Sequence, residues 1–114
     1  MSQSYLSEGL YRVISQNEEE VVVVLSDASH KIFKAHFEGM PLLPGFLQID
    51  IIAEILEKEI VAITSAKFVQ KLLPNETLTY KIAPTKSGVR VKLSNSSGEL
   101  CGDFKLKWED LNTN

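Results

Sequence analysis

The sequence holds a single cysteine, Cys101, so no disulfide can form within the chain. A chain without disulfides is typical of a reducing compartment, and we expect a cytoplasmic protein. Long apolar runs are also missing, since none reaches the roughly 20 residues that a membrane-spanning helix needs. The first residues show no cationic start followed by an apolar core. The sequence therefore predicts neither a secretory signal peptide nor a membrane partner.

Positive charge is also scarce, because the formal net charge is −3 and the isoelectric point is near 5.4. This balance gives no electrostatic reason to expect nucleic acid as a partner. The sequence predicts no cofactor and no metal site. Its 114 residues, 44% of them hydrophobic, suit one domain with a real core. We expect residues 1–114 to form this domain, with residues 1–8 and 109–114 as frayed tails.

The second half of the chain alternates between apolar and polar residues with a period of two. Strict alternation in successive segments predicts an antiparallel sheet with one face on the core and the other in water. Residues 61–69 form a probable earlier strand by composition, and Pro74 to Glu76 is a turn signal. The apolar members of the three alternating segments are Leu78, Tyr80, Ile82, Val89, Val91, Leu93, Phe104, Leu106 and Trp108.

A helix is predicted over residues 45–59, where apolar side chains occupy most of the helical circumference. A helix with so wide an apolar arc is expected to be enclosed by the rest of the chain. Residues 21–25, an unbroken aliphatic run, indicate a strand buried on both faces. One enclosed helix and a run of antiparallel strands predict an α+β domain, a curved sheet wrapped around a long central helix.

Between that strand and the helix, residues 26–44 read as an irregular segment that contains His36. Its glycines and prolines fix the backbone direction, so we expect a shaped loop that leads directly into the helix at Gly45. A loop of this length in a small domain usually carries function. The other histidine, His30, is expected to be an ordinary hydrogen-bonded side chain.

Three groups around this segment suit the elimination of water from a 3-hydroxyacyl thioester. The His36 imidazole can remove a proton next to a carbonyl group. The unpaired N–H groups of a helix that starts at Gly45 can stabilise the enolate-like oxygen that follows. A protonated Asp50 carboxyl could give a proton to the departing hydroxyl. Composition alone does not single out this reaction.

The order His36-Phe37-x-Gly39-x-Pro41-x-x-Pro44-Gly45, followed by Asp50, closely resembles the 3-hydroxyacyl-[acyl-carrier-protein] dehydratases of the FabZ/FabA type. The resemblance extends over roughly residues 21–108. It implies the hot-dog fold, a long helix wrapped in a curved antiparallel sheet. Ala35 and Glu38 depart from the usual glycine and proline of the family. The segment from Leu43 to Asp50 looks most like the small ApeI-type thioester dehydratases.

The resemblance also implies roles for individual residues. His36 would be the catalytic base and Asp50 the acid. The N–H group of Gly45 would bind the thioester oxygen, with Phe46, Phe37 and Pro44 beside the substrate. The two catalytic side chains of one site would come from two subunits, which implies a homodimer or a larger assembly of dimers. The substrate would be carried by acyl carrier protein, or by coenzyme A, in fatty acid or related lipid or polyene biosynthesis.

Two other functions stay open at this point. A hot-dog thioesterase would use a carboxylate to activate water, and a non-catalytic acyl-binding or dimerisation module would keep the shape without turnover. Asp50 also has a purely structural interpretation, because an acidic residue near a helix N-terminus is stabilised by the helix dipole. Gly45 could simply serve the turn into the helix. Cys101 is expected to be a small buried hydrophobic residue.

Overall fold

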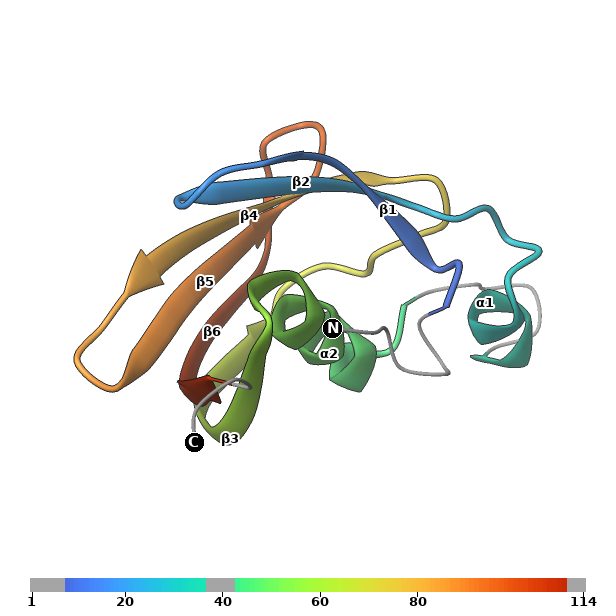
Figure 1. Ribbon diagram of the computed structural model, residues 1–114. Helices are drawn as coiled ribbons and strands as arrows, with labels where there is room; N and C mark the ends of the chain where they lie inside the picture. Colours follow the sequence, from blue (N-terminus) through green and yellow to red (C-terminus); the bar gives the residue numbers. More distant parts are fainter. Residues whose placement is uncertain (1–7, 37–42, 111–114) are drawn as a thin grey trace.

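The computed structural model describes residues 8–36 and 43–110 of the chain. A curved sheet surrounds one long helix, and a short helix lies beside the start of the sheet (Figure 1). The elements, in order, are β1 (Tyr11–Gln16), β2 (Glu20–Leu25), α1 (Lys31–His36), α2 (Gly45–Leu56), β3 (Lys58–Phe68), β4 (Thr77–Pro84), β5 (Gly88–Ser94) and β6 (Leu100–Asp110).

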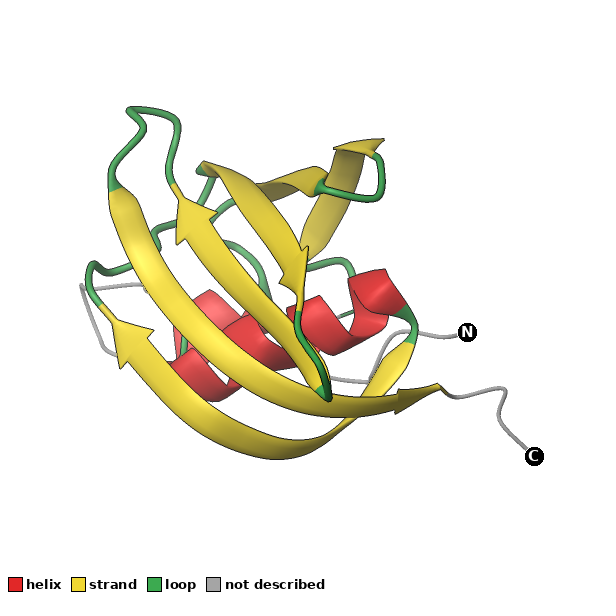
Figure 2. Ribbon diagram, turned by 90° about the vertical axis from the view of Figure 1, so that its left-hand side faces the viewer, coloured by secondary structure: helices red, strands yellow, loops and turns green. Residues whose placement is uncertain are grey.

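The six strands form a single antiparallel sheet in the order β1-β2-β4-β5-β6-β3. Short turns join β1 to β2, β4 to β5 and β5 to β6. The strand β3 follows α2 directly and pairs with β6 at the far edge of the sheet. Helix α2 lies across the concave face (Figure 2). The predicted α+β arrangement of a central helix and a curved antiparallel sheet is therefore confirmed.

The core lies between α2 and the concave face of the sheet. Leu78, Tyr80 and Ile82 of β4 are buried, while the residues between them are partly or fully exposed, as period-two alternation predicts. Cys101 is buried as well, in accord with its expected role as a small hydrophobic residue. The buried apolar residues of α2 are Leu47, Ile49, Ile51, Ile52 and Ile55.

Helix α2 ends at Leu56, three residues earlier than the sequence predicts. Glu57 adopts the left-handed conformation, with φ 55°, and its N–H group donates to the carbonyl of Glu54. The strand β3 then begins at Lys58, which pairs with Asp110 of β6. Pairing with a strand far along the chain overrides the local helix propensity here. The local sequence pattern does not contain this long-range pairing.

The predictions for two upstream segments are also corrected. In β2 only Val21, Val23 and Leu25 are buried, so this strand covers the core with one face and not with both. The segment predicted to be irregular contains helix α1. The N–H group of Ile32 donates to Nδ1 of His30 at 3.1 Å, so His30 caps this helix. Its Nε2 therefore donates to the carbonyl of Glu8 at 2.8 Å, which confirms the expected hydrogen-bonded role.

The sequence predicts that the C-terminal tail starts at residue 109, whereas the last strand ends at Asp110. Strand β6 continues through Glu109 and Asp110, which pair with β3. Residues 1–7 and 111–114 lie outside the described residues, as do residues 37–42. In the described ranges, no helix is long and apolar enough to cross a membrane.

Candidate active site at the start of helix α2

The N-terminus of α2 presents backbone N–H groups that the helix itself leaves unpaired. Pro44 precedes the helix in an extended conformation, with φ −61° and ψ 146°, and no side chain caps it. The N–H groups of Leu47 and Gln48 donate to the Pro44 carbonyl at 3.1 and 3.3 Å. Those of Gly45 and Phe46 have no acceptor within the helix, because the first turn lies beyond the reach of intrahelical hydrogen bonds. Both are available to a negatively charged oxygen.

A glycine at the first helical position lets an aromatic ring approach the backbone. A Cβ atom added at Gly45 would lie 3.0 Å from ring atoms of Phe68. Phe68 is half exposed and packs edge-to-face on Phe104, with ring centroids 5.4 Å apart. The Phe68 ring therefore covers the side of the helix start on which a side chain at position 45 would lie.

A cavity of about 300 Å³ opens beside this helix start. It lies between the first turn of α2 and the segment that follows β3. The N–H group of Leu43 donates to the carbonyl of Leu72 at 2.8 Å and holds the two segments together. The residues that line the cavity are Leu43, Gly45, Gln48, Phe68, Val69, Gln70 and Lys71.

Gln48 is a residue of this cavity that the sequence reasoning missed. Its side chain is only 4% exposed, whereas its neighbours on the inner side of α2 are apolar. Its Nε2 donates to the carbonyl of Leu43 at 3.4 Å, and its Oε1 has no hydrogen-bond partner among the described residues. The available signal was a polar residue on the apolar side of the helix, three residues after Gly45.

Asp50 lies one turn further along α2 and is partly buried. Burial, and secondarily the charge of Glu54 one turn on, raise the pKa of the Asp50 carboxyl above its ordinary value of 3.8. Tyr11 of β1 donates a hydrogen bond from its hydroxyl to Oε1 of Glu54 at 2.8 Å. A carboxyl with a raised pKa keeps its proton to higher pH, as a general acid must.

Asp50 and Gly45 do not share a face of α2. Five residues separate them, which corresponds to about 140° around the helix and about 7.5 Å along its axis. Phe46, the second donor of the first turn, lies four residues before Asp50 and therefore on the same side of the helix.

The structure describes the other predicted site residues only in part. His36 is the last residue of α1, and the position of its side chain lies outside what the structure describes. Phe37 lies outside the described residues. Phe46 has 59% of its surface exposed next to the unpaired N–H groups. The roles of His36, Phe37 and Phe46 stay predictions.

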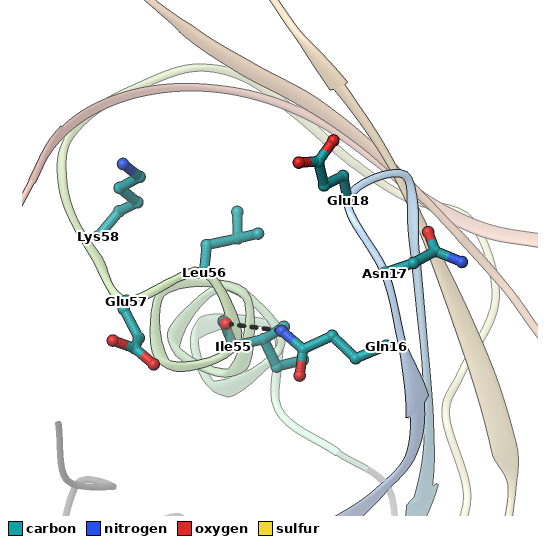
Figure 3. A pocket seen from close by; sticks show the side chains of 7 residues that line it. All are labelled: Gln16, Asn17, Glu18, Ile55, Leu56, Glu57 and Lys58. Atoms are coloured by element: carbon teal, nitrogen blue, oxygen red, sulfur yellow. Dashed lines mark hydrogen bonds between the residues drawn. The ribbon is translucent and has the colours of Figure 1, made fainter.

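A larger cavity, of about 500 Å³, lies at the opposite end of α2 (Figure 3). It opens between the turn after β1 and the last residues of the helix, where Nε2 of Gln16 donates to the carbonyl of Ile55 at 3.4 Å. The carboxylates of Glu18 and Glu57 line it together with Lys58, and the carbonyl end of the helix lies beside them. The two carboxylates and the carbonyl end of the helix outweigh the single positive charge, so this cavity suits a developing oxyanion less well than the start of the helix does.

The buried apolar residues of α2 are packed against the sheet. A small void between the helix and strands β4 and β5 is lined by Ile52, Ile55, Leu56, Tyr80, Ile82 and Val91, and it is too small for water. The cavity beside Phe68 and Val69 is the opening next to the helix start.

Comparison with known proteins gives the class to which this site belongs. The family model of ApeI-like proteins, described as ApeI dehydratase, matches residues 13–105. The chain therefore belongs to the ApeI-like dehydratase family. No curated protein matches the sequence.

Solved structures show the same fold. The dehydratase heterocomplex ApeI:P from Xenorhabdus doucetiae aligns with a TM-score of 0.74 and 24% identity, over 86% of this chain and 96% of that one. A pyran synthase domain from module nine of the sorangicin pathway aligns with a TM-score of 0.68 and 16% identity, over 99% of this chain and 42% of that one. Thioesterase superfamily member 2 from Mus musculus aligns with a TM-score of 0.58 and 16% identity, over 87% of this chain and 81% of that one. The predicted hot-dog fold is thus confirmed, and these identities carry the fold alone.

Proposed function

We propose that this protein removes water from a 3-hydroxyacyl thioester and gives the trans-2-enoyl thioester. The observation that carries the proposal is the pair of unpaired N–H groups at Gly45 and Phe46, which open beside a cavity in a chain of a dehydratase family. We further propose that acyl carrier protein, or else coenzyme A, carries the substrate. The pathway would be fatty acid or related lipid or polyene biosynthesis.

The reaction needs a base, an oxyanion site and an acid. The His36 imidazole takes the proton from C2, and the electron pair moves onto the thioester oxygen, where the Gly45 N–H group stabilises it. The C2=C3 double bond then forms as the C3–O bond breaks. The leaving hydroxyl takes the proton of Asp50 and departs as water. Transfer of the His36 proton to Asp50, through water, restores both groups.

We also propose that the active protein is a homodimer in which each site uses His36 of one chain and Asp50 of the other. The resemblance to the FabZ/FabA-type dehydratases, which implies a site shared between two subunits, supports this arrangement. A suitable contact surface is present at the edge of the sheet, where β3 has one strand neighbour only. Val61 and Ile63 on this edge are each about half exposed, at 51% and 53%. An exposed apolar edge strand is a template for pairing with another chain.

The first experiment follows the absorbance of the conjugated enoyl thioester with a short 3-hydroxyacyl thioester as substrate. The wild type, His36→Ala and Asp50→Asn are compared. Reversible dehydration that both substitutions abolish supports the proposal. An inactive wild type with every chain length and carrier contradicts it and favours an acyl-binding module. Release of free thiol identifies a thioesterase.

Mixing the two inactive variants tests whether the sites are shared. After subunit exchange, half of the dimers are hybrids, and each hybrid has one site with both catalytic groups intact. We therefore expect about a quarter of wild-type activity to return. If His36 and Asp50 of the same chain act together, no hybrid contains an intact site and mixing restores nothing.

A further inference from the structure

Gln48 is the one polar side chain that is buried among the described residues. Its Oε1 and the hydroxyl of Tyr80 are the two buried side-chain polar atoms of this part of the chain that have no hydrogen-bond partner. Burial of an unpaired polar atom opposes folding, so proteins rarely keep one without a use. The Tyr80 hydroxyl faces a void too small for a ligand, whereas Gln48 lines the cavity at the helix start.

The orientation of the Gln48 carboxamide follows from its surroundings. The carbonyl of Leu43, 3.4 Å away, can only accept a hydrogen bond, so the group that faces it must be the NH₂ group. The hydrogen bond from the Leu43 N–H group to Leu72 fixes that carbonyl in turn. The oxygen of the carboxamide is therefore the group left over for another partner. It can accept a hydrogen bond and cannot donate one.

The position of Gln48 relative to Gly45 matches the two oxygens of a 3-hydroxyacyl thioester. Residues three apart on a helix are neighbours, so the Gln48 side chain leaves α2 next to Gly45. An N–H donor at Gly45 suits the thioester carbonyl oxygen, and an acceptor at Gln48 suits a hydroxyl group two carbons away. The hydrogen bond to Leu43 is long and the terminal torsion of glutamine is broad, so a small rotation that keeps this bond can bring the buried oxygen to the cavity wall.

We propose that the carboxamide oxygen of Gln48 accepts a hydrogen bond from the 3-hydroxyl group of the substrate. This inference rests on the proposed function and adds a positioning residue to it. An acceptor cannot protonate the leaving hydroxyl, so Gln48 holds the C3–O bond in place and leaves the acid role to Asp50. Its loss therefore raises KM for the hydroxyacyl substrate and leaves kcat unchanged.

The test compares the wild type with Gln48→Met, which keeps the length of the side chain and removes its polar atoms. We expect KM for a 3-hydroxybutyryl thioester to rise about tenfold, the effect of one lost hydrogen bond. KM for the enoyl thioester in the hydration direction should not change, because that substrate has no 3-hydroxyl group. The melting temperature should change little, since the variant removes the unpaired Oε1 atom but also leaves the Leu43 carbonyl without its donor.

The matched control is Gln16→Met, because Gln16 is an exposed glutamine at the opposite end of α2, away from the candidate site. This control should leave both KM values unchanged. Gln48→Leu serves as a second variant if the methionine variant does not fold. An unchanged KM in a folded variant at position 48 overturns the proposal. An equal rise in KM for the enoyl thioester also overturns the proposal, because the group that donates to Gln48 would then belong to the thioester arm and not be the 3-hydroxyl.

A binding measurement separates failure of this inference from failure of the proposed function. If the wild type does not turn over, calorimetric titration with 3-hydroxybutyryl-pantetheine and with crotonyl-pantetheine still tests Gln48. About tenfold weaker binding of the hydroxy compound alone in Gln48→Met supports its role even though dehydration is refuted. Equal affinities in the two proteins, or no binding by the wild type, overturn it.

Discussion

Replacement of Asp50 by asparagine separates a catalytic carboxyl from a structural one. The substitution keeps the shape of the side chain and removes both its charge and its acidic proton. Burial, and then the charge of Glu54, raise the pKa of Asp50, so the charged form is disfavoured in the folded protein. If the Asp50 carboxylate stabilised the helix through its charge, its pKa would be lowered in the folded protein.

The expected effects on activity and on stability have opposite signs. A general acid contributes about 10²–10⁴-fold to a rate, so kcat of Asp50→Asn should fall by that factor. Because the folded state holds the Asp50 proton to higher pH than the unfolded state does, ionised Asp50 lowers stability above its folded pKa. The variant should therefore melt at an equal or higher temperature at pH 7. The difference in melting temperature should disappear as the pH falls through the pKa of Asp50 in the folded protein to below its ordinary value of 3.8.

The assay combines enoyl absorbance with thermal melting at several pH values, and Glu54→Gln is the control. The amide oxygen of a glutamine at position 54 can still accept the hydrogen bond from Tyr11. The control removes the neighbouring charge that raises the Asp50 pKa, but it should keep most of the activity. Wild-type turnover in Asp50→Asn refutes the acid role. A lower melting temperature at pH 7 that disappears in acid refutes the direction of the pKa shift.

The remaining predictions concern the fold and the subunit contact. Gly88→Ala should lower the free energy of unfolding, measured with denaturant, by about 3 kcal/mol, because the new Cβ would lie 1.8 Å from the Leu106 carbonyl oxygen. The control Ser87→Ala, at an exposed position, should leave this free energy almost unchanged. Glu57→Gly should raise the free energy of unfolding by about 1 kcal/mol, since it relieves the left-handed conformation at the end of α2 and removes a negative charge there. A lower stability would show that the conformation is not strained. Ile63→Lys should shift the protein from dimer to monomer in light scattering, and an unchanged mass would place the subunit contact elsewhere.

The sheet could be predicted from the sequence because burial on one face leaves a period-two pattern in each strand. Leu78, Tyr80 and Ile82 show that pattern, and all three are buried. The boundaries of the helices were less predictable. By sequence pattern, Leu56 and Lys58 fit a helix equally well. Lys58 belongs to a strand because it has partners on β6, where it pairs with Asp110 and its Nζ lies 5.0 Å from the Trp108 ring. Such partners lie about 50 residues away, beyond any local pattern.

The candidate site was predictable where it depends on local chemistry. An unpaired helix start follows from Pro44 and Gly45 alone, and the structure has it. Gln48 was not predictable in this way. Its burial depends on the segment after β3, which closes over the first turn of α2 only in the folded chain. The raised pKa of Asp50 likewise depends on how the sheet covers the helix.

Helix α2 carries the oxyanion donors in its first turn and the proposed acid one turn further on. Phe46 and Asp50 are four residues apart and lie on the same side of the helix, so both the one-chain and the two-chain site need testing by subunit mixing. Recovery of activity on mixing His36→Ala with Asp50→Asn would assign the two groups of one site to different chains. The half-exposed Val61 and Ile63 on β3, and the exposed Phe46 beside the donors, are the apolar surfaces that a dimer would cover. A substitution on β3 that abolishes both the dimer and the recovered activity would join the subunit contact to the shared site.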